Sequence, residues 1–324
     1  MDLKLRPYSG EADIPVIVDI INRHLAGDSV PFREDVGHFR AHFSRASEMF
    51  DPARDVTIAE VDGEPVAYAY RSWVDTTLEP PMREYRLDGA VLPEWARKGV
   101  GTTLLHDSQE RQLELARTHE TDLPRIFGSW TSDRQAGAIA LLTENGFEPA
   151  RHFYEMTRPL NEPIPDVPVP DGLEVRSLRP DEMRKIWNAD VEAFKDHWGG
   201  FEDTEENFQR WIATPDLDPS LWVVFFDGEV IAGASINRIS KDENEALGVK
   251  RGWLDSVFTT REYRRRGIAR AAVARSLALM KERGMDTGIL GVDVTNPTGA
   301  LRIYEGIGFT VAERSTAWRK PLEL

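Results

Sequence analysis

A turn that combines three arginines with a glycine is the stretch of the sequence best suited to chemistry. Residues 264–267 read Arg-Arg-Arg-Gly, between an apolar, partly β-branched run at 253–260 and a stretch with apolar residues at helical spacing. This order predicts a buried strand, a basic turn and a helix. The helix would point unpaired backbone N–H groups and the positive end of its dipole at the turn. Because glycine lets a phosphate approach the backbone and arginine adds charge-assisted hydrogen bonds, we predict a site for a phosphorylated cofactor.

The spacing of this turn differs from that of the common phosphate loops. It contains neither Gly-x-x-x-x-Gly-Lys-Ser/Thr nor Gly-x-Gly-x-x-Gly. Instead, Arg264-x-x-Gly267-x-Ala269 after a strand resembles the acyl-CoA-binding motif of the GNAT family of acetyltransferases, Arg/Gln-x-x-Gly-x-Gly/Ala. Taken alone, the six residues could equally form the solvated basic first turn of an ordinary amphipathic helix.

A second segment supports the resemblance. Residues 289–295 predict another buried strand, Asn296-Pro297 would end it and start a helix, and Tyr304 follows. In the GNAT family the two strands splay apart here, an Asn or its equivalent holds the pantetheine arm, and a Tyr faces the thioester sulfur. The resemblance thus implies acetyl-CoA as co-substrate. It also implies that the cofactor-binding residues are Val257, Phe258, Thr259, Arg264, Arg265, Arg266, Gly267, Ile268, Ala269, Arg270 and Asn296.

A proline-rich segment, residues 161–172, divides the chain into two halves whose sequences repeat each other. Its alternating prolines exclude a helix and predict an extended, semi-rigid linker. The matching pieces are 3–6 with 173–176, 62–64 with 227–229, 99–101 with 267–269, and 146–147 with 308–309. Self-similarity of this kind indicates two copies of one unit. We therefore predict two tandem GNAT-like domains, residues 1–160 and residues 173–324.

The same segments predict the fold of each copy. Each reads as a strand, one or two helices, three antiparallel strands, the cofactor helix, a fifth strand, a further helix and a closing hairpin. This is an α/β (α+β) arrangement, a mixed and mostly antiparallel sheet flanked by helices, as the resemblance implies. Strands four and five would be parallel neighbours that part at one end, leaving a cleft for the cofactor.

The two copies differ at the positions that could carry chemistry. Apolar residues of the first copy stand where the second has reactive ones: Ala96 for Arg264, Leu142 for Tyr304 and Leu87 for Asp255. The first copy keeps a usable phosphate turn at residues 97–101. We therefore predict a structural or weakly cofactor-binding first half and a catalytic second half.

Asp255 is the candidate base. Acyl transfer to an amine needs a base, because alkyl amines are ammonium ions at neutral pH. The resemblance places a base-type carboxylate at this strand position, and strict alternation would put Asp255 on the face of Val257 and Thr259. Alternatively, Asp255 pairs with a nearby arginine such as Arg251 and only holds structure.

Tyr304 is the candidate acid. The resemblance implies that its phenol hydrogen-bonds the sulfur and donates a proton as the thiolate leaves. Alternatively, a buried tyrosine packs its ring and caps a carbonyl. Backbone groups of residues 257–259 would pair with the pantetheine arm like an added strand, and an N–H there would polarise the thioester carbonyl.

The acceptor would bind to the helical stretch that follows the first strand of the second copy. Phe194, Asp196 and Trp198 could line an amine pocket, with the acid meeting a cation and the indole offering a π face. Phe194 and Trp198, four residues apart, could equally be the buried face of a helix end. His197 is an alternative base.

Composition narrows the function classes. The chain of 324 residues has a formal charge of −15, which argues against nucleic-acid binding, since counterion release needs clustered Lys and Arg. The acidic exterior could favour a cationic acceptor, or serve only solubility. With no cysteine there is neither a disulfide nor a thiolate metal site, and we expect no metal. No apolar run reaches the length of a membrane span, so we expect a cytoplasmic monomer or homodimer without a membrane partner.

The residues and the resemblance together predict an N-acetyltransferase that moves an acetyl group from acetyl-CoA to a primary amine of a small molecule by direct attack. Among tandem GNAT proteins the architecture resembles that of mycothiol synthase, which makes an amino-sugar thiol precursor an alternative acceptor. A non-catalytic acyl-CoA-binding sensor or partner-binding module is the alternative function.

Overall fold

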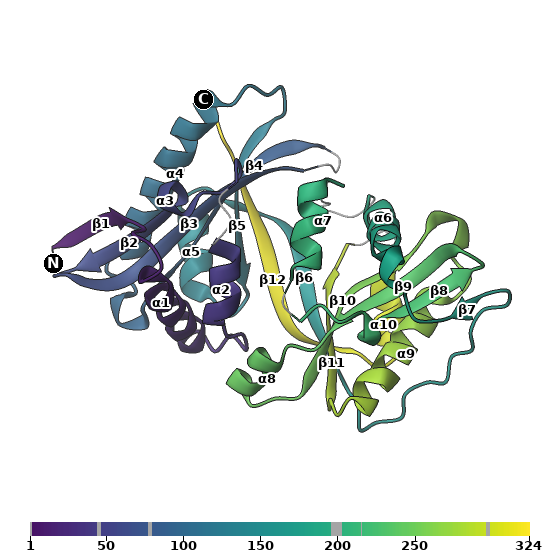
Figure 1. The fold of residues 1–324 in the computed structure, drawn as a ribbon. Coiled ribbons are helices and arrows are strands. Elements are labelled where there is room, and N and C mark those ends of the chain that lie inside the picture. Colours follow the sequence, from purple (N-terminus) through teal and green to yellow (C-terminus); the bar gives the residue numbers. More distant parts are fainter. Residues whose placement is uncertain (1, 44–46, 77–79, 196–202, 215, 296–298) are drawn as a thin grey trace. The chain divides into compact units, whose positions relative to one another are not determined.

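The computed structural model describes residues 2–43, 47–76, 80–195, 203–214, 216–295 and 299–324 (Figure 1). The chain folds into two compact units. The first contains the residues up to Thr76, Pro80–His152 and the C-terminal Ser315–Leu324, and the second contains Phe153–Arg314.

The first unit is built on a sheet with the strand order β1-β2-β3-β4-β5-β12. Only β4 and β5 are parallel neighbours, and the other pairs in this order are antiparallel. The strands are β1 (Leu3–Pro7), β2 (Val56–Val61), β3 (Glu64–Thr76), β4 (Met82–Val91), β5 (Arg125–Ser132) and β12 (Thr310–Pro321). The helices are α1 (Asp13–Gly27), α2 (Val36–Phe43), α3 (Pro52–Asp55), α4 (Val100–Thr118) and α5 (Ala136–Glu144), with a 3-10 turn η1 (Pro93–Trp95).

The second unit repeats this plan with the strand order β6-β11-β10-β9-β8-β7. Again the pair that precedes and follows the long helix, β10 and β11, is parallel. The strands are β6 (Glu148–Pro159), β7 (Glu174–Val175), β8 (Val223–Asp227), β9 (Val230–Arg238), β10 (Arg251–Thr259) and β11 (Thr287–Asp293). The helices are α6 (Met183–Phe194), α7 (Glu205–Ile212), α8 (Lys241–Leu247), α9 (Ile268–Glu282) and α10 (Ala300–Glu305), with 3-10 turns η2 (Pro180–Glu182), η3 (Pro219–Leu221) and η4 (Arg261–Tyr263).

The closing strands depart from the expected consecutive division of the chain. β6 belongs to the first copy in sequence, yet its residues 153–159 pair with β11 of the second unit. β12 closes the second copy in sequence, yet its residues 315–321 pair with β5 of the first unit. The expected closing hairpin of each copy is therefore wrong, because each copy ends in one long strand that completes the sheet of the other unit. Residues 161–172 form neither helix nor strand, and Val167 and Val169 pack on the second unit.

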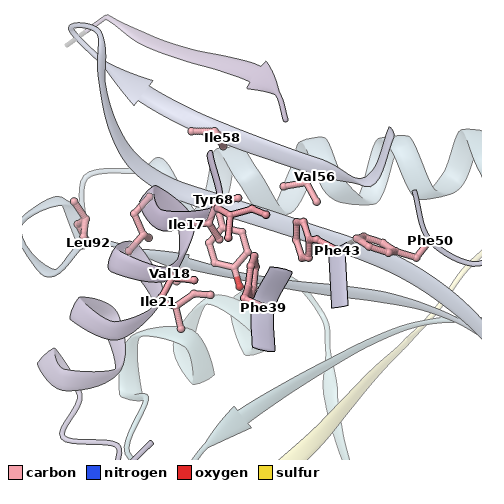
Figure 2. Packing of buried hydrophobic residues seen from close by; sticks show 13 residues of the cluster. Ile17, Val18, Ile21, Phe39, Phe43, Phe50, Val56, Ile58, Tyr68 and Leu92 are labelled. Carbon is pink, nitrogen blue, oxygen red and sulfur yellow. The ribbon is translucent and has the colours of Figure 1, made fainter. Parts of the chain in front are cut away.

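Helices cover the sheet of the first unit by burying an apolar stripe. α1 contributes Ile17 and Ile21, and α2 contributes Phe39 and Phe43, to a cluster with apolar side chains of β2 and β3. Figure 2 shows these side chains together with Tyr68 of β3. Apolar residues spaced three and four apart face one side of a helix, which explains why these short helices form on this sheet.

In the second unit, α6 and α9 cover opposite faces of the sheet, as Figure 1 shows. Alternation along β8 directs Val224 into a cluster with Ile186 of α6, and Val223 into another with Ile268 of α9. This two-sided layering places β10 between the two helical layers, and the candidate site lies along that strand.

Candidate active site

The turn between β10 and α9, residues 264–267, is called the phosphate turn here after its predicted ligand, and it has the conformation that its glycine predicts. Gly267, the N-cap of α9, has φ of 85°, and Arg265 has φ of 66°. A Cβ placed on Gly267 would meet nothing within 4 Å, so the space in front of the helix is open. Hydrogen bonding in α9 begins with Ala271 N donating to Gly267 O at 3.0 Å. The N–H groups of the preceding residues therefore have no acceptor within the helix and face the open space.

The arginines of the turn take different directions. Arg264 bends back toward the carbonyl oxygens of Thr259 and Ala193, at 3.5 and 3.4 Å. Arg266 donates to the carbonyl oxygen of Asp171 at 2.8 Å. Arg265 and Arg270 are exposed. Arg266 is exposed as well, but it already donates to a carbonyl oxygen, so Arg265 and Arg270 are the ones best able to meet a phosphate. Ile268 is buried and anchors the helix.

Beyond its first three residues, β10 has an open edge in the described part of the chain. Its ladder with β11 covers only Arg251–Trp253 opposite Thr287–Ile289. Residues 257–259 pair on the other side with β9, through Val257 to Ser235 and Thr259 to Gly233. The parallel neighbours part at one end, as predicted. The free N–H and C=O groups of this edge can pair with an extended chain lying between the strands.

Asp255 lies at a β-bulge. The register of β10 against β9 shifts between Leu254 and Ser256, which leaves Asp255 as the extra residue. In consequence Asp255 and Ser256 both line a cavity on the α6 side, whereas Val257 packs in the cluster on the α9 side. The expected alternation that put Asp255 on the face of Val257 is wrong, because a bulge interrupts the period of two.

Asp255 forms its ion pair with Arg238, whereas Arg251 forms an ion pair with a different residue. Arg238 donates from Nε and Nη2 to the two carboxylate oxygens of Asp255, at 3.0 and 3.3 Å. Arg251 instead pairs with Glu243 at 2.6 Å. Burial by the surrounding protein raises the pKa of Asp255, and Arg238 opposes this shift. Solvent still reaches the Asp255 side chain, whose exposed fraction is 37%, so the carboxylate is open to a ligand.

The cavity beside Asp255 has a volume of about 290 Å³ and an acidic, aromatic lining. This size suits part of a small metabolite. Its walls come from α6, α7, β9 and β10 and the segment after α7. The lining residues are Asp190, Phe194, Trp211, Thr214, Asp216, Leu217, Trp222, Ile236, Asn237, Arg238, Asp255 and Ser256.

Asp190 of α6 also lines this cavity, and it is not among the residues that the sequence motifs predict. It is buried, and its Oδ1 accepts a hydrogen bond of 2.6 Å from the Ser256 hydroxyl. Burial raises the pKa of Asp190 to about 6, against the effect of that hydrogen bond. A signal was available in the sequence, because Asp190 lies four residues after Ile186 on the buried stripe of an amphipathic helix.

Tyr304 lies in the layer opposite the cavity. It packs in the cluster with Leu254 and Val257 of β10, and its ring meets Phe309 edge-on at 6.0 Å. No described residue hydrogen-bonds its phenol, and burial raises the pKa of Tyr304 to about 12. Asp255 and Tyr304 thus flank β10 from opposite sides, next to the edge where β10 and β11 part. Asn296, Asp196, His197 and Trp198 lie outside the residues that the structure describes.

The first unit repeats the turn without the reactive side chains. Gly99 has φ of 85° and Arg97 has φ of 60°, matching the turn before α9. Leu142 accepts a 3.0 Å hydrogen bond from the Phe147 N–H. Tyr304 accepts the same bond, also 3.0 Å, from the phenylalanine five residues after it. The predicted equivalence of Leu142 and Tyr304 therefore holds in the structure.

The first unit also lacks a bulge equivalent to the one that exposes Asp255 in the second unit. The register of β3 against β4 is continuous, and Leu87 is buried in an apolar cluster.

Within the described parts of the chain, no helix is long and apolar enough to cross a membrane, and no group of acidic or histidine side chains could hold a metal ion.

Comparison with known proteins places this geometry in a family. Residues 181–309 match the Acetyltransferase (GNAT) family. A mycothiol acetyltransferase from Salinispora arenicola is 26% identical over 303 residues, covering 92% of this chain and 91% of that protein. One from Thermomonospora curvata is 30% identical over 223 residues, covering 68% of each. The structure of a tandem GNAT protein from the clavulanic acid biosynthesis pathway resembles this one with a TM-score of 0.74, at 14% identity and over 100% of this chain and 99% of that one.

The matched segment contains the phosphate turn, the parted strands and the acidic cavity, and the relatives extend over both halves of the chain. The chain therefore belongs to the Acetyltransferase (GNAT) family, as a tandem N-acetyltransferase similar to the mycothiol acetyltransferases.

Proposed function

We propose that the second half of the chain moves an acetyl group from acetyl-CoA to a primary amine of a small molecule by direct attack. The observation that carries the proposal is the position of β10. Its open edge leads from the bulge at Asp255 to the turn at Gly267, so one strand connects the cavity that could take an amine with the turn that could take a phosphate. The family generally uses acetyl-CoA, and the open space at Gly267 suits its pyrophosphate.

Each end of the cofactor has a place in this arrangement. The free N–H groups at the start of α9, with Arg265 and Arg270 nearby, would bind the pyrophosphate. The open edge of residues 257–259 would pair with the pantetheine arm, and an N–H there would polarise the thioester carbonyl. The thioester would then lie between Asp255 on one side of β10 and Tyr304 on the other.

Asp255 would act as the base. Its carboxylate takes a proton from the acceptor ammonium, directly or through water, and the neutral nitrogen attacks the thioester carbonyl carbon. A raised pKa makes this carboxylate a stronger base than an ordinary aspartate, and the exposed side chain allows the proton to leave. Arg238 holds the carboxylate in place.

Tyr304 would act as the acid. The carbon–sulfur bond breaks as the new carbon–nitrogen bond forms, and the phenol gives its proton to the departing sulfur. A pKa of about 12 keeps the phenol protonated at neutral pH, as this role requires. Because no described residue hydrogen-bonds the hydroxyl, it is available to the sulfur.

The names of the relatives favour a second acceptor class. Several of them are mycothiol acetyltransferases, so an amino-sugar thiol precursor is the alternative acceptor for the same site. Mass spectrometry of the product would separate this class from simple amines, because the acetyl group would appear on an acceptor that carries its own thiol.

The test is a panel of primary amines with acetyl-CoA, in which the coenzyme A thiol released is measured with a thiol reagent. The chain has no cysteine, so the protein adds no background signal. We expect Tyr304→Phe and Asp255→Asn each to lower kcat by about 100-fold or more, with KM for acetyl-CoA nearly unchanged. Tyr154→Phe is the matched control, since Tyr154 packs on the same cluster as Tyr304 but lies on β6. Full turnover by Tyr304→Phe, or no turnover with any amine, would contradict the proposal.

A further inference from the structure

The lining of the cavity beside Asp255 contains more carboxylates than the acetylation of a single amine requires. Its charged lining consists of three carboxylates, Asp190, Asp216 and Asp255, and one guanidinium, Arg238. Arg238 is occupied by Asp255 through two hydrogen bonds. In the described part of the chain, neither Asp190 nor Asp216 has a cationic partner. The cavity therefore has a net charge of −2 at neutral pH, which favours a ligand with more than one positive charge.

Of these two carboxylates, Asp190 is the one whose negative charge is more costly to bury. It is 6% exposed, and Ser256 satisfies only its Oδ1. No described residue donates a hydrogen bond to Oδ2. An ionised carboxylate so deeply buried is costly unless a cation or several hydrogen bonds compensate it. Because Asp190 lines the cavity, a ligand can supply that compensation.

Two tryptophans form an aromatic wall of the same cavity. The rings of Trp211 and Trp222 lie 5.4 Å apart at an angle of 30°. Trp222 is fixed by its indole N–H, which donates to the carbonyl oxygen of Asn237 at 3.2 Å. Aromatic faces attract ammonium groups and also bury the methylene groups that separate them. A short alkyl chain with a cation at each end matches this combination.

The positions of Asp190 and Asp255 determine how such a ligand would lie in the cavity. Asp190 is bonded to Ser256, which directly follows Asp255 in β10. The bulge directs both of these β10 residues into the cavity. One amine of the ligand can therefore lie at Asp255, beside the open edge of the strand, while a second lies at Asp190 near α6.

We propose that the acceptor is a small diamine, and that Asp190 binds its second, non-reacting ammonium group while the first amine is acetylated. This deepens the proposed function and rests on it for the identity of the reacting site. Asp190 is then a specificity-determining residue, and Asp255 remains the base.

Binding can be measured without any turnover. The full chain is titrated by calorimetry with 1,4-diaminobutane and, separately, with butylamine, with and without coenzyme A, at about pH 7.5. We expect the diamine to bind about tenfold or more tightly than the monoamine, as one added charge-assisted hydrogen bond in a partly desolvated site implies. In Asp190→Asn, which can still accept the Ser256 hydrogen bond, the two dissociation constants should become similar.

Glu192→Gln is the matched control. It makes the same chemical change on the same helix, but Glu192 is exposed and pairs with Lys195 outside the cavity. This variant should keep the preference for the diamine. Equal affinity of the wild type for both amines, or binding of neither, would overturn the proposal. So would an unchanged preference in Asp190→Asn, in particular if Asp216→Asn abolished it.

An assay of acetyl transfer distinguishes a failure of this proposal from a failure of the proposed function. Acetylation of monoamines and diamines with equal kcat/KM would leave the acetyltransferase site in place and reject the role of Asp190. Preferential diamine binding without transfer of acetyl groups would support the pocket and contradict the acyl-transfer chemistry.

Discussion

Asp190 illustrates how a candidate functional residue stands out by the energetic cost of burying its charge. Among the residues that the structure describes, this carboxylate on the buried stripe of α6 has one hydrogen bond, from Ser256, and no cationic partner, so its charged form is unfavourable for folding. Asp255, its neighbour in the cavity, is compensated by Arg238 and remains open to solvent. The two acids therefore differ in environment, and this difference suits the roles that we propose for them, cation binding by Asp190 and proton transfer by Asp255.

Replacing Asp190 by asparagine should stabilise the protein at neutral pH. The pKa of Asp190 is about 6 in the folded state, against an ordinary value of 3.8. The folded state thus binds the proton more tightly, and the free energy of unfolding falls as the pH rises between these values, by roughly 3 kcal/mol at most. Asparagine carries no such charge. We expect Asp190→Asn to unfold at higher urea concentration than the wild type at about pH 7.5, with a smaller difference at about pH 4.5.

The control for this pH dependence is again Glu192→Gln. Exposed charge pairs contribute little, so its effect on the free energy of unfolding should stay within about 0.5 kcal/mol at either pH. If Asp190→Asn destabilised the protein at neutral pH, the carboxylate would have to be compensated by groups other than Ser256, and its availability to a ligand would be disproved.

At the scale of elements, both halves build the same turn before their long helix. Gly99 and Gly267 share φ of 85°, and in each case a Cβ would meet nothing within 4 Å. What differs is the strand before the turn. β10 has a bulge that brings Asp255 into a cavity, whereas β4 keeps a continuous register and buries Leu87. The two halves therefore share the turn and differ in the residues that we propose for catalysis.

The shared geometry allows a matched comparison of the two turns. Glutamate at Gly267 would place a negative charge in front of the free N–H groups of α9, and should abolish both acetyl-CoA binding to the second unit and turnover. Glutamate at Gly99 causes the same backbone strain, since φ is equal, and should leave turnover intact. Calorimetric titration of acetyl-CoA into Gly267→Glu and Gly99→Glu tests this, alongside the thiol-release assay. Loss of turnover in Gly99→Glu alone would assign the active site to the first half.

The local sequence was sufficient to predict the strand, the turn and the helix around Gly267. The predicted strand at 253–260 is β10, and the helix begins at Ile268, because glycine at a turn and apolar residues at helical spacing act over short distances. The bulge at Asp255 was not predictable in this way. It depends on how β10 pairs with β9, and the pairing of Arg238 with Asp255 depends on the same register.

The exchange of closing strands also lay beyond local sequence. Residues 148–159 and 310–321 each follow a Gly-Phe pair and end in a basic residue followed by proline, so they predict the same element. Either strand could complete either sheet by its own pattern. Only the packing distinguishes them, because Met156 of β6 fits the cluster around Leu254, and Trp318 of β12 fits the cluster around Tyr85. Such complementarity depends on side chains far apart in the sequence.

At the scale of the whole molecule, each unit needs a strand from the other half of the sequence. β12 supplies the first unit with Trp318, which is buried, packs in a cluster with Trp73 and Phe127, and donates its indole N–H to Thr131 at 2.8 Å. Residues 1–160 expressed alone would lack this side chain and leave one edge of β5 without its partner. The first unit should therefore fold only when the C-terminal strand is present.

Trp318→Ala tests this dependence, because Trp318 packs in a cluster whose other members, apart from Leu322, lie between Trp73 and Phe147, far earlier in the sequence. A buried tryptophan replaced by alanine costs about 3–5 kcal/mol. Amide hydrogen exchange should show lost protection in β3, β4 and β5, while β9 and β10 keep theirs. Met156→Ala, a similar deletion on β6, should have the reciprocal effect, with protection lost in β10 and β11. The reverse pattern, Trp318→Ala exposing the second unit and Met156→Ala the first, would mean that each copy keeps its own closing strand in solution, and the folding units would then be consecutive in sequence.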